Sequence, residues 1–399
     1  MAVSPLARMP LGDLLGAQSA GVIQFRGVPY AQPPIGALRF APPRPITPWT
    51  GLCDASQHGP IPLQPTSRLR TVLGEINRPQ SEDCLTLTIS TPAPDNRARP
   101  VLVWLHGGAF VSGAGSLDWY DGTRLAREGD QVVVGVNYRL GPLGFLYQPG
   151  ISNGKQGLLD VIGALQWVQE HIHCFGGDPS RVTVAGQSAG AHMILCLLAQ
   201  PDTRHLFQRA ILQSAPTGVA PFSLATAQEY GNSFLDILHI EQGPSEAVAS
   251  ALRAETPTHF IEAMGKLARR TARFAQLTLP FMPVIDELST SERFLEAAAT
   301  GAGAAGIDLV IGTTREEAHA FLLDGSVPEP DLHLFAESFS QLTGEEDALK
   351  AYQLRRPGGT LLEVVSDFMT DSTILFPSLR FAEAASRAGA RTWVYQFNW

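Results

Sequence analysis

Residues 182–190 read Val-Thr-Val-Ala-Gly-Gln-Ser-Ala-Gly, an apolar run that leads directly into the motif Gly-x-Ser-x-Gly. The pattern predicts a strand that ends in a tight turn, with a helix over 191–199 behind it. Such a turn lifts one hydroxyl, here that of Ser188, above a parallel sheet, and Gly186 and Gly190 keep side chains out of the bend. The motif alone is weak evidence in a chain with 38 glycines, but the strand before it and the helix after it make Ser188 a candidate nucleophile.

Short apolar runs rich in β-forming residues alternate along the chain with helical patterns. We expect strands at 101–105, 131–136, 182–185, 210–212, 307–311 and 392–397. Apolar side chains recur at helical spacing over 158–172, and residues 222–275 also have a largely helical pattern. This alternation predicts an α/β fold, with a central, mostly parallel sheet and helices on both faces. We expect one domain over 1–399, with a cap-like helical insertion at about 222–281.

Composition narrows the possible functions and locations. The chain has 399 residues, of which 44% are hydrophobic, so a large core can form in one domain with insertions. A net charge of -9 makes nucleic acid an unexpected partner. No apolar run approaches the roughly 20 residues that span a bilayer, and the first residues lack the pattern of a signal peptide. The four cysteines follow no metal or redox spacing, which favours reduced thiols and a cytoplasmic location. Nothing in the sequence indicates the oligomeric state.

A second motif, His-Gly-Gly-Ala-Phe at 106–110, comes immediately after the expected strand at 101–105. Small residues at this point let backbone N–H groups face a ligand, as in the oxyanion loop that follows the third strand of many hydrolases. The alternative is an ordinary Gly-Gly turn, which becomes a weak explanation once the motif around Ser188 is considered with it. No second ligand lies at metal-like spacing from His106, so we expect no metal there and assign His106 to orienting the loop.

Much of the chain resembles the type-B carboxylesterase/cholinesterase family of α/β-hydrolases, and most of all its bacterial carboxylesterases. The resemblance extends from about residue 20 to the C-terminus. It is carried by stretches at 25–34, 81–85, 137–145, 175–179, 186–190 and 212–214. It implies the α/β-hydrolase fold and a serine carboxylesterase that hydrolyses small carboxylic esters through an acyl-enzyme, without cofactor or metal.

The resemblance also implies which backbone groups form the oxyanion hole. The family uses the second and third small residues of its loop and the residue after the serine, which are Gly108, Ala109 and Ala189 in this sequence. Spacing alone would not separate Gly107 from Gly108. We expect the substrate pocket to be lined by apolar residues that include Phe110.

The catalytic acid is expected in the stretch Gly-Thr-Thr-Arg-Glu-Glu-Ala at 312–318. The resemblance implies that Glu317 takes this role. A carboxylate just past the end of a buried strand also lies where α/β sheets carry functional residues. Alternatively, Glu316 and Glu317 are carboxylates in a first helical turn capped by Thr313 or Thr314, a role that we expect for Glu316.

The general base is the part of the triad that we expect to be missing. Only His319 and His333 follow Glu317 in the sequence. On a helix the side chain of His319 would point roughly 200° away from Glu317, and His333 has the pattern of a surface or half-buried histidine. Family members place the base after a last strand that residues 393–399 resemble. We therefore expect the histidine base to be absent and the chain to be a fragment or a shortened member, incomplete at its C-terminus and inactive or weak on esters.

Specificity and an alternative function also follow from the sequence. Gln187 stands where the family commonly has glutamate, so we expect no preference for cationic substrates such as choline esters over neutral ones. The alternative function is a non-catalytic family member that acts by protein binding, although such members usually lose the serine that this chain keeps.

Two further patterns are interpreted as non-functional. Residues 301–306 match Gly-x-Gly-x-x-Gly, but they follow a helix and precede a strand, so we expect a flexible loop rather than a dinucleotide site. Cys84 resembles half of a family disulfide whose partner position lies near Pro62, where no cysteine stands, so no disulfide is expected.

Overall fold

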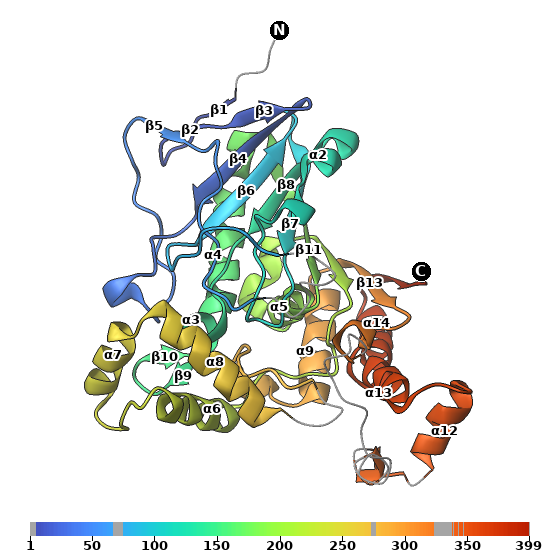
Figure 1. The fold of residues 1–399 in the computed structure, drawn as a ribbon. Helices are drawn as coiled ribbons and strands as arrows, with labels where there is room; N and C mark the ends of the chain where they lie inside the picture. The colour runs from blue at the N-terminus through green and yellow to red at the C-terminus, as the bar shows by residue number, and fades with distance from the viewer. Residues whose placement is uncertain are drawn as a thin grey trace.

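A nine-stranded sheet forms the centre of the molecule, with helices on both faces (Figure 1). The structure, a computed structural model, describes residues 5–66, 75–272, 277–322, 337, 339–341, 343–345 and 347–398. The strands in spatial order are β14 (Arg391–Phe397), β13 (Asp308–Thr314), β12 (Arg209–Gln213), β11 (Gly177–Gln187), β7 (Arg99–Leu105), β8 (Val132–Val136), β6 (Thr86–Thr91), β4 (Val22–Pro29) and β3 (Ala17–Ser19). Neighbouring strands from β14 to β8 run parallel, and those from β8 to β3 run antiparallel. The expected α/β fold with a mostly parallel sheet is confirmed.

Helices of different character cover the two faces. On one face α2 (Thr123–Gly129) packs Ala126 against Val133 and Leu102. The other face carries α4 (Gln156–His171), α5 (Ala189–Leu198), α9 (Ser291–Ala304) and α14 (Phe376–Arg387). Every residue of α5 is buried, because this helix is apolar all round and packs between the sheet and α9. The serine motif at the start of α5 is therefore held by a wholly buried helix.

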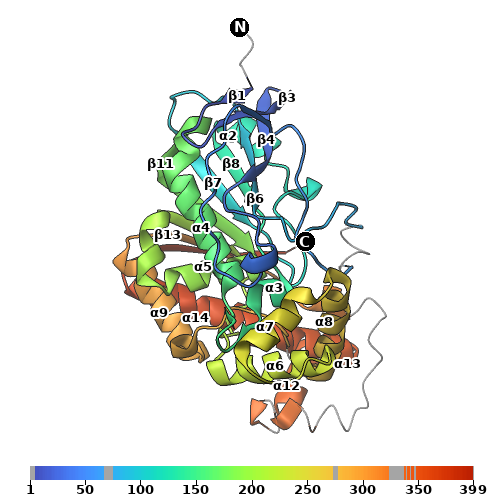
Figure 2. The ribbon, with the colours of Figure 1, turned by 90° about the vertical axis from the view of Figure 1, so that its left-hand side faces the viewer.

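Smaller elements gather around this centre. The segment expected to form a cap holds α6 (Leu224–Ile237), α7 (Ser245–Ala254) and α8 (Pro257–Thr271), which lie together at the end of the molecule away from the N-terminus (Figure 2). Ser223 and Thr256 cap α6 and α8, since their side-chain oxygens accept the N–H groups of Thr226 and His259. The remaining elements are β1 (Leu6–Ala7), β2 (Asp13–Leu15), η1 (Gly36–Leu38), β5 (Leu52–Asp54), η2 (Asp118–Tyr120), α3 (Gly141–Phe145), β9 (Tyr147–Gln148), β10 (Ser152–Asn153), η3 (Ile172–Phe175), η4 (Pro201–Leu206), η5 (Asp286–Leu288), α10 (His319–Leu322), α12 (Ala348–Arg355), α13 (Leu361–Met369) and the π-helical segment η6 (Thr370–Leu375). No helix within the described residues is long and apolar enough to cross a membrane.

The glycine-rich stretch 301–306 is not the flexible loop that its sequence suggests. Its first four residues form the last turn of α9. A Cβ atom at Gly301 would lie 1.8 Å from the carbonyl oxygen of Leu198, and one at Gly303 would lie 2.2 Å from that of Ala388. Glycine is needed at these positions because α9 approaches two other backbones closely, so the flexible-loop interpretation was wrong.

Candidate active site

Ser188 stands at the corner between β11 and α5. Its backbone angles are φ 54° and ψ -119°, a conformation rarely adopted by a residue with a side chain. The N–H of Ser188 donates to the carbonyl oxygen of Gln213 at 2.9 Å, and its own carbonyl oxygen accepts the N–H of His192 at 2.9 Å. The side chain is half-buried rather than enclosed. This is the sharp strand-to-helix turn that the motif predicts.

The two glycines of the motif allow that turn to form. A Cβ atom at Gly190 would lie 2.0 Å from the carbonyl oxygen of Leu105, at the end of the neighbouring strand β7. One at Gly186 would lie 2.7 Å from the carbonyl carbon of Gly190 across the bend. Because both contacts involve backbone atoms, no side-chain movement could make room for a larger residue.

The predicted oxyanion loop lies directly against the turn. A Cβ atom at Gly107 would come within 3.2 Å of the Cβ of Ser188. Positive φ values of 121° at Gly108, 55° at Ala109 and 61° at Phe110 curl the loop. Within the described residues, the backbone N–H groups of Gly108, Ala109 and Ala189 donate to no protein acceptor. These three donors next to Ser188 could stabilise a developing oxyanion.

His106 anchors the loop at 106–110 to the buried Tyr138. Its Nδ1 donates to the carbonyl oxygen of Gly107 at 2.8 Å, and its ring stacks on Tyr138 with centroids 4.3 Å apart. The hydroxyl of Tyr138 donates to the carbonyl oxygen of His106 at 2.7 Å. Burial lowers the pKa of His106 to about 4, so the ring is neutral at physiological pH. No group of three or more potential metal ligands occurs among the described residues.

Phe110, predicted to line the substrate pocket, is wholly buried. Its ring packs edge-on against Phe145 at 5.3 Å and against His192 at 5.6 Å between centroids. The ring therefore supports the loop within the core of this structure, and its contact with substrate stays a prediction.

Glu317 follows β13 at the same edge of the sheet as Ser188, since β12 alone separates β13 from β11. One carboxylate oxygen, Oε1, accepts the N–H of Thr314 at 2.6 Å, and the backbone N–H of Glu317 donates to Oγ1 of Thr370 at 3.1 Å. Burial raises the pKa of Glu317, while hydrogen bonds from Thr314 and from the Ser214 side chain oppose that rise. The sheet thus brings the predicted acid towards the predicted nucleophile.

Ser214 is a site residue that our reading of the sequence missed. It follows β12 with φ 49°, its side chain hydrogen-bonds Glu317, and its N–H donates to the carbonyl oxygen of Gly312 at 2.7 Å. The preceding residue, Gln213, accepts the N–H of Ser188. Ser214 and Gln213 therefore connect the acid to the nucleophile, and their place at the carboxyl end of a buried strand was the signal that could have revealed them.

Tyr395 of β14 is a second unpredicted neighbour of the acid. Its ring lies over Gly312, where a Cβ atom would be 2.0 Å from the ring carbon Cζ. Burial raises the pKa of Tyr395, and the nearby charge of Glu317 adds to the rise. The packing of this ring explains why position 312 holds a residue without a side chain.

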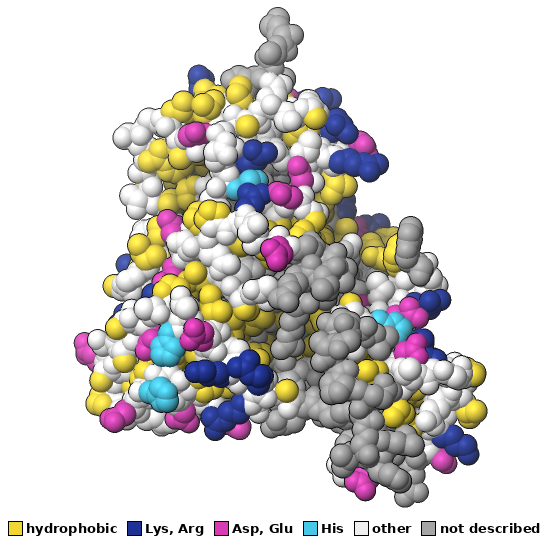
Figure 3. Space-filling view, viewed as in Figure 1, with side chains coloured by type: hydrophobic (Ala, Val, Ile, Leu, Met, Phe, Trp, Pro, Cys, Tyr) yellow, Lys and Arg dark blue, Asp and Glu magenta, His cyan; other side chains and the backbone are white. Residues whose placement is uncertain are grey.

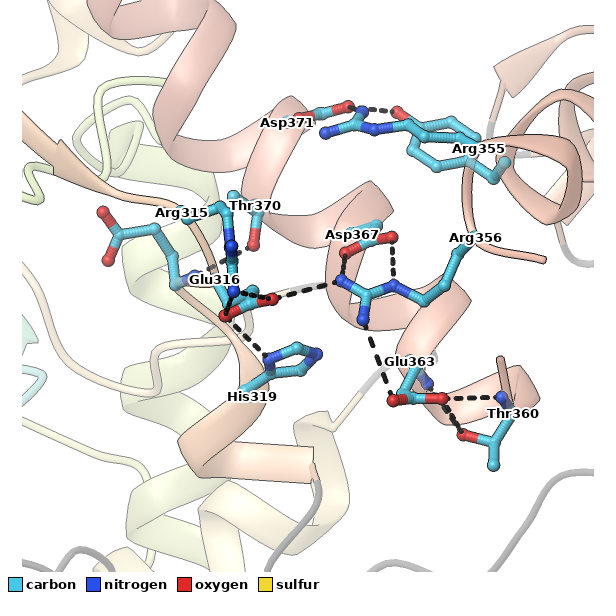
Figure 4. Close-up of polar contacts among 12 residues, drawn as sticks. Arg315, Glu316, His319, Arg355, Arg356, Thr360, Glu363, Asp367, Thr370 and Asp371 are labelled. Carbon is cyan, nitrogen blue, oxygen red and sulfur yellow. Dashed lines mark hydrogen bonds and ion pairs between the residues drawn. The ribbon is translucent and has the colours of Figure 1, made fainter. Parts of the chain in front are cut away.

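Glu316 is turned into a separate ionic cluster (Figure 4). Its carboxylate lies 3.4 Å from Nη2 of Arg356, which also binds Asp367 through Nε at 2.8 Å. Burial opposes ionisation, but Arg315 and Arg356 hold the pKa of Glu316 below its ordinary value. These ion pairs, rather than the expected helix dipole alone, explain the position of the Glu316 carboxylate and its lowered pKa.

Two histidines follow Glu317 in the sequence, and the structure shows no contact between either of them and the Glu317 carboxylate among the described residues. Nδ1 of His319 lies 3.8 Å from Oε2 of Glu316, so this ring belongs to the ionic cluster (Figure 4). His333 lies outside the described residues. The buried His192 donates from Nε2 to the carbonyl oxygen of Val219 at 2.9 Å and faces the core.

Comparison with known proteins identifies the family. The model of the carboxylesterase family matches residues 3–399. The para-nitrobenzyl esterase of Bacillus subtilis is 38% identical over 402 residues, which cover 97% of this chain and 77% of that protein. The phenmedipham hydrolase of Pseudarthrobacter oxydans is 37% identical, with coverage of 100% of this chain and 79% of that protein.

Solved structures agree with the sequence relatives. A thermophilic PNB esterase superposes with a TM-score of 0.84 at 34% identity, covering 99% of this chain and 79% of that one. A carboxylesterase of Geobacillus stearothermophilus superposes with a TM-score of 0.85 at 33% identity, covering 99% of this chain and 80% of that one. The chain therefore belongs to the carboxylesterase family, a family of ester hydrolases, and has the α/β-hydrolase fold.

Proposed function

We propose that this chain attacks carboxylic esters with Ser188 and forms an acyl-enzyme. The observation that supports the proposal is the contact between the strained turn at Ser188 and the loop at 106–110. The N–H groups of Gly108, Ala109 and Ala189 donate to no acceptor among the described residues. Donors arranged in this way stabilise the charge that develops on a carbonyl oxygen under attack.

The reaction follows from this geometry. The hydroxyl of Ser188 gives up its proton to water or buffer as its oxygen forms a bond to the ester carbonyl carbon, and the resulting oxyanion accepts hydrogen bonds from the N–H groups of Gly108, Ala109 and Ala189. Collapse of the tetrahedral intermediate releases the alcohol, which takes up a proton, and leaves the acyl group on Ser188. Water then hydrolyses the acyl-enzyme to the acid and restores the hydroxyl.

We further propose that the 399-residue chain turns over esters slowly, because no histidine among the described residues is placed to accept the proton of Ser188. Glu317 is held in place to orient such a base, yet within the described residues no histidine contacts Glu317 or the Ser188 hydroxyl. Loss of one triad member can lower the rate by about 10⁴-fold, while the oxyanion donors keep some catalysis above the rate in water.

Two measurements test these proposals. With p-nitrophenyl butyrate in excess, intact mass spectrometry should show slow addition of one butyryl group to Ser188, none in Ser188→Ala, and normal addition in the control Ser180→Ala, whose exposed serine lies at the far end of β11. Imidazole in the buffer should speed turnover above the Ser188→Ala background, since it supplies the missing base. Absence of the adduct would contradict the proposal that Ser188 is the nucleophile. Full turnover without imidazole would contradict the proposal that the chain has no base for Ser188.

The neutral side chain of Gln187 supports a preference for neutral esters. Its Oε1 lies so close to the loop that a Cβ atom on Gly107 would be 2.4 Å away, so the side chain beside the loop is a neutral amide rather than a carboxylate. Faster acylation by a choline ester than by a neutral ester of the same acid would contradict this preference.

We also propose a cytoplasmic location. All four cysteines are free, and burial raises the pKa of the Cys84 and Cys196 thiols well above the ordinary value, which makes them unreactive. This supports a reducing compartment. Recovery of the protein from a secreted or periplasmic fraction of its host would contradict the proposal.

A further inference from the structure

The loop at 106–113, which carries two of the three N–H donors, has a strained backbone. Two of its residues with side chains, Ala109 and Phe110, have φ values of 55° and 61°, a region that such residues rarely adopt. Within the loop, the carbonyl oxygen of Gly108 accepts the N–H of Ser112 at 3.0 Å and its hydroxyl at 3.2 Å. These bonds close a tight ring, but they do not fix how the ring is oriented against the serine. Contacts from outside the loop have to set that orientation.

Gln64, which lies far from this loop in the sequence, binds the last residue of the loop at two points. Its Oε1 accepts the N–H of Gly113 at 2.7 Å, and its Nε2 donates to the carbonyl oxygen of Gly113 at 2.9 Å. Gly113 lies against the start of the loop, since a Cβ atom there would be 2.5 Å from both Nδ1 of His106 and the carbonyl oxygen of Gly107. One side chain thereby fixes the residue at which the two ends of the loop meet.

The amide of Gln64 is itself held in a single orientation. The side chain is buried, and its Nε2 also donates to the carbonyl oxygen of Pro62 at 2.9 Å. The backbone N–H of Gln64 donates to Oε1 of Gln80 at 2.9 Å, which ties this segment to the chain before β6. Reversal of the amide would place its oxygen against the carbonyl oxygens of Pro62 and Gly113. Because a buried polar group without a partner is costly, these bonds resist movement of Gly113.

We propose that Gln64 is a positioning residue for the oxyanion hole. Through Gly113 it keeps the N–H groups of Gly108 and Ala109 turned towards the ester carbonyl. This inference rests on the function proposed above for Ser188. Donors act only when they are aimed at the oxygen on which charge develops, and a displacement of about 1 Å can lower a rate by about 10²-fold. The amide of Gln64 binds Gly113 rather than the donors, so its effect passes through the backbone of the loop.

Two esters that differ in one atom separate this role from simple support of the fold. When Ser188 attacks a thionoester, charge develops on sulfur, which accepts hydrogen bonds more weakly than oxygen does. Partial unfolding slows acylation by both esters equally, whereas misplaced donors slow acylation by the oxygen ester more. Both esters are uncharged, and charged side chains of both signs are interspersed on the face shown in Figure 3, so electrostatic attraction does not bias the comparison.

The variant Gln64→Met removes both bonds to Gly113 and keeps an unbranched side chain of similar length. Intact mass spectrometry with p-nitrophenyl butyrate and its thiono analogue measures the acylation rate of Ser188. We expect the rate with the oxygen ester to fall at least about tenfold and the oxygen-to-sulfur rate ratio at least about threefold. The ester concentration at half-maximal rate should stay within about twofold, because the donors act on the developing charge more than on the bound ester.

The matched control is Gln169→Met in α4. The amide of Gln169 also donates to two backbone carbonyl oxygens, those of Pro179 and Leu206, each at 2.9 Å. Pro179 lies at the end of β11 away from Ser188, so this variant should leave the oxygen-to-sulfur rate ratio unchanged. Equal ratios in the two variants would overturn the proposal.

Hydrogen exchange tests the hold on the loop without any reaction at Ser188. The N–H of Gly113 loses its acceptor in Gln64→Met, so the peptide that covers 107–113 should exchange at least about tenfold faster at this amide than in Gln169→Met. Equal exchange in the two variants would overturn the proposal. A missing adduct in the unchanged chain would overturn the role of Ser188 alone, and exchange would then decide whether Gln64 holds the loop. Gln64→Glu keeps the acceptor for Gly113 but loses the donor, and it provides the same measurements should Gln64→Met fail to fold.

Discussion

Ser188 shows how single residues position the candidate site. A non-glycine residue with φ 54° and ψ -119° costs about 1–3 kcal/mol and persists only where its surroundings enforce it. Here the enforcement comes from backbone contacts at Gly186 and Gly190 and from hydrogen bonds at both ends of the serine. The turn that exposes the Ser188 hydroxyl is therefore strained, and the packing of the neighbouring strands and of α5 maintains this strain.

The motif glycine next to β7 can be tested directly. Gly190→Ala would place its Cβ 2.0 Å from the carbonyl oxygen of Leu105, so we expect a loss of about 2 kcal/mol or more in the free energy of unfolding and no acylation of Ser188. The control is Gly163→Ala in α4, whose Cβ meets nothing closer than 3.7 Å. That change should stabilise the protein by about 0.5–1 kcal/mol. Urea denaturation measures both, and equal effects would contradict the steric argument.

The buried carboxylate of Glu317 predicts a pH dependence of stability. Burial raises its pKa in the folded state, so the folded protein binds its proton more tightly than the unfolded chain does. Stability from this group is complete below the ordinary value of 4.5 and is lost as the pH rises through the raised folded value.

Glu317→Gln removes this ionisation while it keeps a hydrogen-bond acceptor for Thr314. We therefore expect the variant to be more stable than the unchanged chain at pH 7 to 8, with a difference that disappears below about pH 4. Thermal unfolding across this range provides the measurement. A variant that is less stable at neutral pH would show that the hydrogen bonds to the charged form outweigh burial.

At the scale of elements, a buried ion pair fastens α4 to the segment after β8. Asp160 of α4 accepts the backbone N–H of Arg139 at 3.1 Å and binds its guanidinium at 2.8 and 2.7 Å, and both side chains are almost inaccessible. The charge of Asp160 counters burial and keeps the pKa of Arg139 above its ordinary value. This contact holds the start of α3 beside the core.

Removal of one partner should leave a buried charge uncompensated. Asp160→Asn is expected to lower the free energy of unfolding by about 3–5 kcal/mol. Glu128→Gln, which breaks the exposed pair with Arg124 on α2, should change it by less than about 1 kcal/mol. Denaturant midpoints with unchanged slopes would measure both effects. Similar losses of unfolding free energy in the two variants would contradict the argument that burial makes the Arg139–Asp160 pair more important than the exposed one.

The same scale shows where prediction from sequence succeeded and failed. Expected strands such as 101–105 and 307–311 were found because periodic apolar residues report the burial of a strand wherever it packs. The stretch 301–306 misled us because glycine signals a turn when only neighbours in sequence are considered. Here it serves a close approach to Leu198 and Ala388, which lie far away in the chain.

The whole molecule has a second, smaller hydrophobic cluster outside the main core. Phe339, Val364 and Val365 form its buried centre, with side chains of α12 and α13 packed around them. These helices project from the sheet (Figure 1) and connect to the β13 end through the ion pairs of Arg356 (Figure 4). A unit with so small a core can open without unfolding the rest.

Hydrogen exchange should reveal this difference in local stability. We expect backbone amides of α13 to exchange at least about tenfold faster than those of α5, a difference of about 1.4 kcal/mol or more in opening free energy. Mass spectrometry of peptides from the two helices provides the comparison within one sample. Equal protection would indicate that α12 and α13 unfold only with the whole domain.

The amino-acid sequence by itself determined the α/β class, the strand order along the chain, the turn at Ser188 and the loop at 106–110. These features depend on residues next to one another, through the sterics of glycine and the period of apolar side chains, so they can be read without a structure. The sequence motifs also indicated the family that the comparisons established.

Only the tertiary structure decided what surrounds Glu317. Ser214, Thr370 and Tyr395 reach the acid from β12, η6 and β14, and their meeting depends on strand register and packing. Contacts between distant segments arise from three-dimensional packing as a whole, and no local pattern of side chains encodes which residues will meet.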